Sequence, residues 1–396
     1  MKKTLFALSL GFILLSATIT SCKDDTTDPG PTTSTTELTS KKVTTAPSMD
    51  GIVEPSWDAC DKLTGNATVP NLANDFKWFV GESYKFTMRS MYDASNLYIL
   101  VEYDDPTKSV DRMSWYFDAT AKLWKQHNKK PTSATDKFYE DKFSFLWPTT
   151  TTAAAWSSTT CYNTCHGVDK TKGFDTENKH FTNSANEVVD QWHFKLVRTG
   201  PGNQTDDQMQ IYIDPNNPLT AGPNGDQKLE GGRGSDPKTT GGVADNKQTL
   251  NNGVANVSVP KYVIPGKTGY FIINKSEIDG GTAKLITAVD ANGVLTYAGG
   301  TIDPTDAGYV ANTGAKRFPS IIFNGPMDGS RGEVITYANH IGTGWVIEIK
   351  RALKTTDLIN DIQFDVTKDV MFGFAIFENS AVAHGITPNL KMKFAQ

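Results

Sequence analysis

Residues 85–103 read KFTMRSMYDASNLYILVEY, and this stretch decides the fold class. Residues 85–92 alternate in polarity, as a strand does when one of its faces is buried. The next four residues, DASN, are typical of a turn, and residues 97–103 are almost all apolar, as in a strand covered on both faces. The stretch therefore predicts a β-hairpin near the centre of a sheet.

Short strands of this kind recur along the chain. They are predicted at residues 142–147, 191–197, 208–213, 269–274, 320–323, 333–338, 345–350, 370–377 and 390–394. Helices are predicted only around residues 119–126 and just after residue 351. Many short strands with few helices predict a mainly β chain, folded as an antiparallel β-sandwich with long loops. Residues 200–260, rich in Gly, Asn and Asp, are expected to be a loop-rich insertion, either a functional flap or a flexible segment.

The N-terminal residues predict export. Lys2 and Lys3 precede an apolar run at residues 5–15, which is too short to span a bilayer. The sequence ITSC at residues 19–22 is typical of a bacterial lipoprotein signal, in which Cys22 is acylated. The alternative is a plain secretory signal with a cysteine nearby.

The expected organisation follows from this signal. Residues 1–21 are a signal peptide, and residues 22–45, rich in Thr, Ser, Pro, Asp and Lys, form a disordered acylated tether. Residues 46–396 form the folded domain. The protein is then lipid-anchored to the outer membrane, on its periplasmic or cell-surface side.

Charge and motif content exclude several function classes. The chain has 39 Lys and Arg against 44 Asp and Glu, a formal net charge of −5. No basic stripe stands out, so a nucleic-acid partner is not expected. No Ser-His-Asp, paired-carboxylate or HExxH pattern stands out either, which indicates a protein without catalytic chemistry of its own.

The stretch CYNTCH at residues 161–166 predicts a covalently bound haem. Cys161 and Cys165 each add to one vinyl group, and His166 then ligates the iron. The usual attachment site has two residues between the cysteines and this chain has three, so the extra residue has to bulge outward. The alternative is a short-loop disulfide beside an incidental histidine.

Further motifs resemble two related families. Residues 46–57, 92–93 and 96–98 resemble the opening strands of family 9 carbohydrate-binding modules. Residues 139–142, 161–167, 190–195, 198–201, 344–353 and 374–379 resemble the haem-binding domain of the ethylbenzene dehydrogenase γ-subunit family. This resemblance implies a β-sandwich that holds one haem and serves a molybdenum dehydrogenase in electron transfer. The γ-subunit, however, holds a b-type haem through methionine and lysine, whereas this chain carries an attachment site. The molybdoenzyme partnership is therefore not carried over.

The axial iron ligands are expected to be His166 and His384. The resemblance places one ligand near the middle of the chain and the other near its end, and His384 follows a segment of small residues at 380–383. The alternative is His193, whose side chain should point away from that of its strand neighbour Trp192. Thioether alternatives are Met113 and Met88. Polar, loop-like surroundings predict solvent exposure for His127, His180 and His340.

Other side chains have two interpretations each. Several apolar residues either line a haem pocket or form ordinary strand core: Phe143, Phe145, Leu146, Trp147, Trp192 and Phe194. Lys195 and Arg198 either pair with haem propionates or face solvent and keep the protein soluble. Cys60 is expected to be a buried apolar side chain.

Together these patterns predict an exported, membrane-anchored monohaem c-type cytochrome. It would carry one covalent haem and exchange electrons with a redox partner protein that the sequence does not identify. The alternative is a surface β-sandwich lipoprotein that binds glycans and holds no haem. The colour of the purified protein distinguishes the two.

Overall fold

The computed structural model describes residues 30–71, 76–152, 156–160, 182, 184, 186–212, 233–267, 269–309 and 316–396. The expected signal peptide, Cys22, His180 and the CYNTCH stretch of residues 161–166 lie outside the described residues. From Pro31 onward the chain forms one compact unit. Within the described ranges, no helix has the length and apolar character needed to cross a bilayer.

Strands dominate the described residues. They are β1 (Thr33–Ser34), β2 (Glu37–Lys42), β3 (Lys62–Thr68), β4 (Ser83–Tyr92), β5 (Asn96–Asp104), β6 (Trp115–Asp118), β7 (Leu123–Gln126), β8 (Lys142–Pro148), β9 (Val189–Lys195), β10 (Asp206–Gln210), β11 (Arg233–Ser235) and β12 (Gly242–Asp245). They continue with β13 (Gln248–Asn251), β14 (Asn256–Val259), β15 (Tyr262–Val263), β16 (Ile273–Asn274), β17 (Lys284–Val289), β18 (Leu295–Tyr297), β19 (Gly300–Ile302), β20 (Ile321–Gly325), β21 (Ile335–His340), β22 (Gly344–Ala352), β23 (Val370–Phe377) and β24 (Gly385–Phe394). The short α-helices are α1 (Trp156–Thr159) and α2 (Lys275–Asp279), and 3-10 turns cover Pro55–Ala59, Gly200–Gly202, Ala307–Tyr309 and Ser330–Gly332.

The hairpin that decided the fold class is present as β4 and β5. The two strands pair in antiparallel register from Phe86 with Tyr103 to Tyr92 with Leu97. In the turn, the Oδ1 atom of Asp93 accepts the backbone N–H groups of Ser95 and Asn96 at 2.7 and 2.8 Å. Strand β5 also pairs with β22, so it is an inner strand of the sheet, as its apolar sequence predicted.

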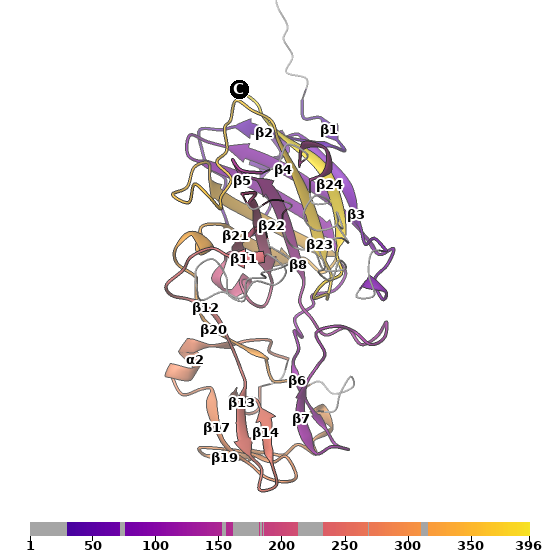
Figure 1. Cartoon of the computed structure of the whole chain (residues 1–396), viewed down its shortest axis with the longest axis vertical. Coiled ribbons are helices and arrows are strands. Elements are labelled where there is room, and N and C mark those ends of the chain that lie inside the picture. Colours follow the sequence, from indigo (N-terminus) through magenta and orange to yellow (C-terminus); the bar gives the residue numbers. More distant parts are fainter. Residues whose placement is uncertain are drawn as a thin grey trace, which may run out of the picture. The chain divides into compact units, whose positions relative to one another are not determined.

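A large sheet of 13 described strands folds over on itself into two layers (Figure 1). One layer follows the order β11-β10-β9-β8-β23-β24, and the other follows β4-β5-β22-β21, with β2 and β3 joining them. The inward faces bury one hydrophobic core in which Phe86, Phe145 and Phe374 pack ring against ring. The predicted mainly β, antiparallel sandwich is confirmed, with parallel pairing confined to short strands such as β2.

The folded unit begins earlier than the sequence suggested. Strand β2 lies between β24 and β4 and buries Leu38 and Ser40, because its side chains alternate between the core and solvent. The Ser40 hydroxyl accepts a hydrogen bond from Ser90 at 2.9 Å. The disordered tether expected over residues 22–45 therefore does not extend through residues 33–42.

The expected loop-rich insertion contains ordered strands in its described part. Residues 233–260 contribute β11 to β14, of which β13 and β14 form a hairpin. This hairpin packs with β6, β7, β15 and β17 around a second hydrophobic core that includes Trp115, Trp124 and Phe318.

The two helix predictions were wrong. Residues 115–126 form the β6–β7 hairpin, in which Phe117 pairs with Trp124. Asp118 accepts the backbone N–H groups of Thr120 and Ala121, and Lys122 has a φ of 55°, so the segment turns back instead of winding. After residue 351, Asp357 caps a turn through the N–H groups of residues 359 and 360. In both places an aspartate side chain competes for backbone donors that a helix needs.

Candidate functional site

Strands β8 and β9 divide their side chains strictly between two faces. Phe143, Phe145 and Trp147 of β8 point into the sandwich core, as do Trp192 and Phe194 of β9. The intervening residues point to the opposite, outer face of the sheet, because successive strand side chains alternate. This outer face is polar yet buried, and its residues are Lys142, Ser144, Gln191, His193, Lys195, Asp206, Gln208 and Gln210.

His193 lies at the middle of this outer face. Its side chain is 2% exposed, and its Nδ1 atom lies 3.1 Å from the amide oxygen of Gln208. That oxygen only accepts, so Nδ1 carries the proton. In the described part of the chain the Nε2 atom has no hydrogen-bond partner. Burial, together with the cations of Lys195 and Lys142, holds the pKa of His193 well below its usual range. The residue is therefore a neutral imidazole with a lone pair available on Nε2.

The Gln208 amide is itself held in place. Its nitrogen donates to the Ser235 hydroxyl at 3.1 Å, and its oxygen also accepts from the ammonium of Lys195 at 3.4 Å. Lys195 is paired with Asp206, whose other oxygen accepts from Arg331 at 2.6 Å. These contacts orient Gln208, and Gln208 in turn orients the His193 ring, as a carbonyl does for many metal-binding histidines.

His384 and His193 both pack against the ring of Phe377. The ring of His384 is 4.5 Å from that of Phe377, and Phe377 is 5.5 Å from the ring of His193. The Nδ1 atom of His384 lies 2.6 Å from the carbonyl oxygen of Val382, and burial lowers the pKa of the imidazole to about 4. The structure thus brings the two histidines that the sequence singled out against one phenylalanine ring.

Lys142 is a member of the site that the sequence reasoning missed. Its ammonium nitrogen donates to the Ala381 carbonyl at 3.0 Å and lies 4.1 Å from the centre of the Phe377 ring. Burial and the nearby cation of Arg198 hold the pKa of Lys142 well below its usual range. The signal in the sequence was a lysine opening a mostly apolar strand of residues 142–147.

Arg198, expected as a propionate partner, is engaged by a carboxylate of the chain. Its Nε atom donates to Glu140 at 2.6 Å, and Arg112 lies 3.3 Å from the same oxygen. Glu140 also accepts the backbone N–H of Val197 at 2.7 Å. Burial alone would raise the pKa of Glu140, but Arg198 and Arg112 hold it below its usual range.

The remaining candidates lie away from His193. Trp192 packs in the sandwich core against Phe145 and Trp147, on the other face of β9. Met88 is also in this core, and Met113 is half-buried, with its backbone N–H bonded to the Phe138 carbonyl. Of the apolar residues expected around a haem on β8, Leu146 alone shares the outer face with His193.

The prediction that His127 faces solvent was wrong. Its side chain is 4% exposed and stacks on Phe138 with ring centres 3.5 Å apart. Its backbone continues from β7, so the hairpin that replaced the expected helix also buries this histidine. His340 is half-buried and lies 2.9 Å from the carbonyl oxygen of Asp105.

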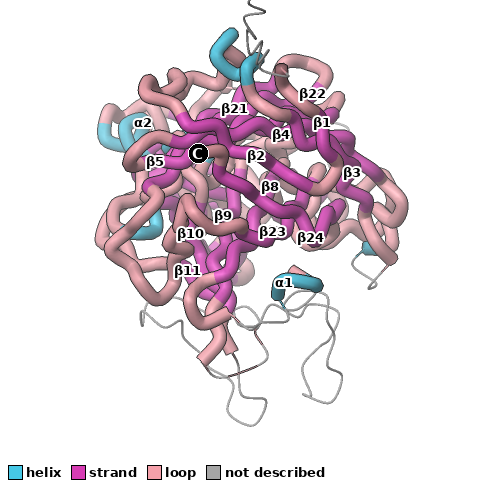
Figure 2. The backbone as a smooth tube through the Cα atoms, turned by 90° about the horizontal axis from the view of Figure 1, so that it is seen from above, coloured by secondary structure: helices cyan, strands magenta, loops and turns pink. Residues whose placement is uncertain are grey.

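Helix α1 packs on the same outer face and leads directly to residue 161. Figure 2 shows α1 beside β24. Trp156 contacts Leu146, Val189 and Met371, and its indole nitrogen donates to the Met371 carbonyl at 2.9 Å. Thr160 is tied to Asn389 of β24 by two hydrogen bonds, of 2.9 and 3.2 Å. Ser144, the register partner of His193, is two residues along β8 from Leu146, or about 7 Å.

Comparison with known proteins gives one family match. Residues 80–387 match the family model described as ethylbenzene dehydrogenase. Two solved structures are similar over most of their length, both of a family 9 carbohydrate-binding module from Caldicellulosiruptor kristjanssonii. The glucose complex has 9% identity and a TM-score of 0.29, covering 91% of this chain and 95% of that one. The cellotriose complex has 9% identity and a TM-score of 0.28, covering 90% and 93%. At these values the likeness carries no argument. No curated protein matches the chain.

The Glu140 ion pair generates a prediction on stability. Arg198→Met should lower the free energy of unfolding by about 3 kcal/mol, because it leaves a buried carboxylate with one cation fewer. Urea denaturation measures this. The loss should shrink as the pH falls through the pKa of Glu140, which lies below its usual range in the wild type, because the protonated carboxyl no longer requires a cation.

Lys137→Met is the matched control. Its partner Glu82 is partly exposed, so the change should cost less than about 1 kcal/mol. Equal, small losses in both variants would contradict a structural role for Arg198.

Proposed function

The chain belongs to the ethylbenzene dehydrogenase family, and on that premise we propose that it is a c-type cytochrome that transfers electrons to or from a redox partner protein. Family membership makes it a protein related to oxidoreductase subunits. The observation that carries the more specific proposal is the stretch CYNTCH at residues 161–166. A bound haem would supply one-electron redox chemistry. The chain would contribute Cys161 and Cys165 as attachment points and His166 as one iron ligand.

The position of α1 supports this proposal. The helix is packed on the outer face of β8, β9 and β23, and the chain leaves it at Thr160, immediately before Cys161. Thr160, the last described residue before the attachment stretch, therefore lies on the face of the sheet that carries His193.

The state of His193 tests whether these residues fit a haem. Iron ligation needs a neutral imidazole with a free nitrogen, and among the described residues nothing occupies the Nε2 atom of the neutral His193. We infer that His193 supplies the second ligand and that His384, which the sequence favoured, is the alternative. The unpartnered Nε2 atom of His193 is the observation that favours it.

The charges around His193 fit an anionic group. The basic side chains of Lys142, Lys195 and Arg198 all act on its imidazole. Lys195 and Arg198 are paired with Asp206 and Glu140, whereas the pKa of Lys142 is held well below its usual range, so a nearby anion would stabilise its charged form. A haem brings two propionates, which such surroundings stabilise.

Anchoring remains part of the proposal. The ITSC sequence at residues 19–22 supports acylation of Cys22, and attachment to the outer membrane would follow. The folded unit starting at Pro31 would then stand a few residues from the lipid.

The first prediction concerns covalent attachment. Protein produced with cytochrome c maturation machinery should keep its haem after denaturation, as seen by mass spectrometry and an alkaline pyridine spectrum. Cys161→Ala and Cys165→Ala should each remove one thioether bond. Cys60→Ala is the matched control, because Cys60 is buried beside Trp57 and Met91 and should not affect the haem. A wild-type protein without haem, or with a Cys161–Cys165 disulfide, would reject the cytochrome in favour of the glycan-binding alternative.

The second prediction concerns the axial ligand. His193→Ala should leave the haem attached but convert it from low spin to high spin, because one nitrogen ligand is lost. His384→Ala and the buried control His127→Ala should stay low spin. Gln208→Leu should stay low spin with a raised midpoint potential, because the imidazole loses the acceptor that increases its basicity.

The absorption spectra of the same variants can also contradict the assignment of His193 as the ligand. A change of spin state in His384→Ala alone would assign the ligand to His384. A methionine-to-iron charge-transfer band in the wild type would reject both histidines and point to Met113.

The third prediction concerns the anchor. Cys22→Ser should release the protein from the membrane fraction, because it removes the acylated side chain. Cys60→Ser should remain membrane-bound. Retention of Cys22→Ser protein in membranes after a high-salt wash would place the anchor elsewhere.

A further inference from the structure

Four aspartates gather inside the sandwich, away from His193. Asp190 is on β9, Asp207 is on β10, Asp236 directly follows β11, and Asp361 lies between β22 and β23. All four are at most 1% exposed. One oxygen each of Asp190, Asp207 and Asp361 lies within 4.8 Å of the other two.

Three of these carboxylates are hydrogen-bonded in the same way, through one oxygen each. The Oδ2 atom of Asp190 accepts the backbone N–H of Ile362 at 2.9 Å, and that of Asp361 accepts the Thr355 hydroxyl at 2.6 Å. The Oδ2 atom of Asp207 accepts from Arg351 at 3.4 Å. Within the described residues, the Oδ1 atom of all three has no hydrogen-bond partner. In each carboxylate, Oδ2 is thus hydrogen-bonded and Oδ1 is available to bind a cation.

Asp236 provides an independent observation. Its backbone N–H donates to the Asp207 carbonyl at 3.1 Å, which fixes its place beside the other three. It is fully buried, and in the described part of the chain neither of its carboxylate oxygens has a hydrogen-bond donor. The groups that act on it are Asp361 and Asp190. A buried side chain with two unsatisfied acceptors therefore lies beside the other acids of the cluster.

The charges do not balance. Arg351 is the cation of the cluster, with its Nη2 atom 2.9 Å from Asp361 and 3.4 Å from Asp207. One guanidinium faces four carboxylates, and buried unpaired charges are costly. Burial and the neighbouring acids raise the pKa of Asp190 to about 7 and that of Asp207 well above its usual range. Either bound protons or a bound cation must supply the missing positive charge.

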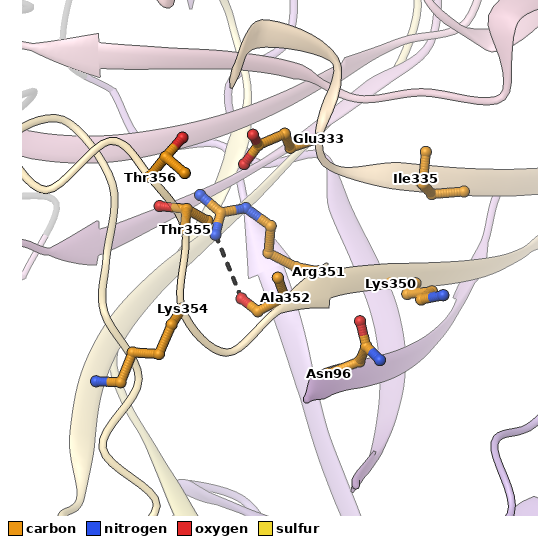
Figure 3. A pocket seen from close by; sticks show the side chains of 9 residues that line it. All are labelled: Asn96, Glu333, Ile335, Lys350, Arg351, Ala352, Lys354, Thr355 and Thr356. Carbon is orange, nitrogen blue, oxygen red and sulfur yellow. Dashed lines mark hydrogen bonds between the residues drawn. The ribbon is translucent and has the colours of Figure 1, made fainter. Parts of the chain in front are cut away.

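A pocket lies beside this cluster, and Figure 3 shows the residues that line it. It has a volume of about 420 Å³, and Glu333, Arg351 and Thr355 are among these residues. Arg351 and Thr355 also contact Asp361 directly, so they stand between the pocket and the acids.

We propose that Asp190, Asp207 and Asp361 bind a Ca²⁺ ion, with Asp236 as a further ligand. All the donors are hard oxygens, which calcium and magnesium prefer over the softer metals. Calcium–oxygen distances of about 2.3–2.6 Å allow two ligands of one ion to lie roughly 4.8 Å apart. Calcium also accepts irregular coordination, whereas magnesium demands a near-ideal octahedron. The site is independent of the haem proposal and ties β9, β10 and β11 to the loop between β22 and β23.

The test is calcium binding to the full-length protein. After EGTA treatment and desalting, titration calorimetry with CaCl2 should show one site per chain, and calcium should raise the melting temperature. Asp207→Asn and Asp361→Asn should weaken binding by about tenfold or more, because each removes a charged ligand. If either fails to fold, Asp236→Asn measures the same effect with less disturbance, because the Asp236 carboxylate accepts no hydrogen bond from a backbone N–H, a hydroxyl or a cation in the described structure.

Asp105→Asn is the matched control, because Asp105 is a buried aspartate with an unpartnered oxygen outside the cluster. It should bind calcium as the wild type does.

Two carboxylate pairs, Asp190 with Asp207 and Asp236 with Asp361, are close enough to share protons instead of binding a cation. Folded wild-type protein that shows neither a stoichiometric calorimetric signal nor a calcium-dependent shift would establish that arrangement and overturn the proposal. Equal calcium affinity in the wild type and all the variants would overturn it as well.

Discussion

The alternation of side chains along β8 and β9 is the constraint on which the rest of the structure depends. Because the period is two, Trp192 is committed to the aromatic core and His193 to the opposite face. Shifting either strand by one residue would exchange these faces, placing a histidine in the core and a tryptophan against Gln208. The packed core therefore selects the register, and the register in turn decides which polar groups meet on the outer face.

Buried carboxylates are paired with cations to different extents on the two faces of this sheet. On the outer face, each buried carboxylate is matched by cations: Glu140 by Arg198 and Arg112, and Asp206 by Lys195 and Arg331. Inside the sandwich, Arg351 pairs with Asp207 and Asp361, two of the four clustered aspartates. The first arrangement surrounds a neutral histidine with basic side chains, which suits an anionic cofactor. The second leaves a surplus of oxygen ligands, which suits a cation.

Much of the fold could be predicted, and the failures have local causes. The apolar strand at residues 97–103 and the turn at Asp93 were evident because strand periodicity and turn chemistry act between near neighbours. The helix expected at residues 119–126 failed because Asp118 and Lys122 close a hairpin, and Trp124 then packs in a second core formed by distant strands. Strand β2 was missed because its six residues are stabilised by β24, more than 300 positions away.

The sequence by itself determined the class of fold, because strand periodicity depends on residues adjacent in the chain, and it predicted a haem-attachment stretch and two candidate histidines. Only the tertiary structure decided that the Nε2 atom of His193 has no partner among the described residues while Gln208 holds Nδ1 across a strand pair. It alone revealed Lys142 beside the histidines and the gathering of Asp190, Asp207, Asp236 and Asp361. These acids are spread over some 170 positions, and no local pattern brings them together. The physical reason is that charge and ligand chemistry depend on distance in space, while sequence patterns report only distance along the chain.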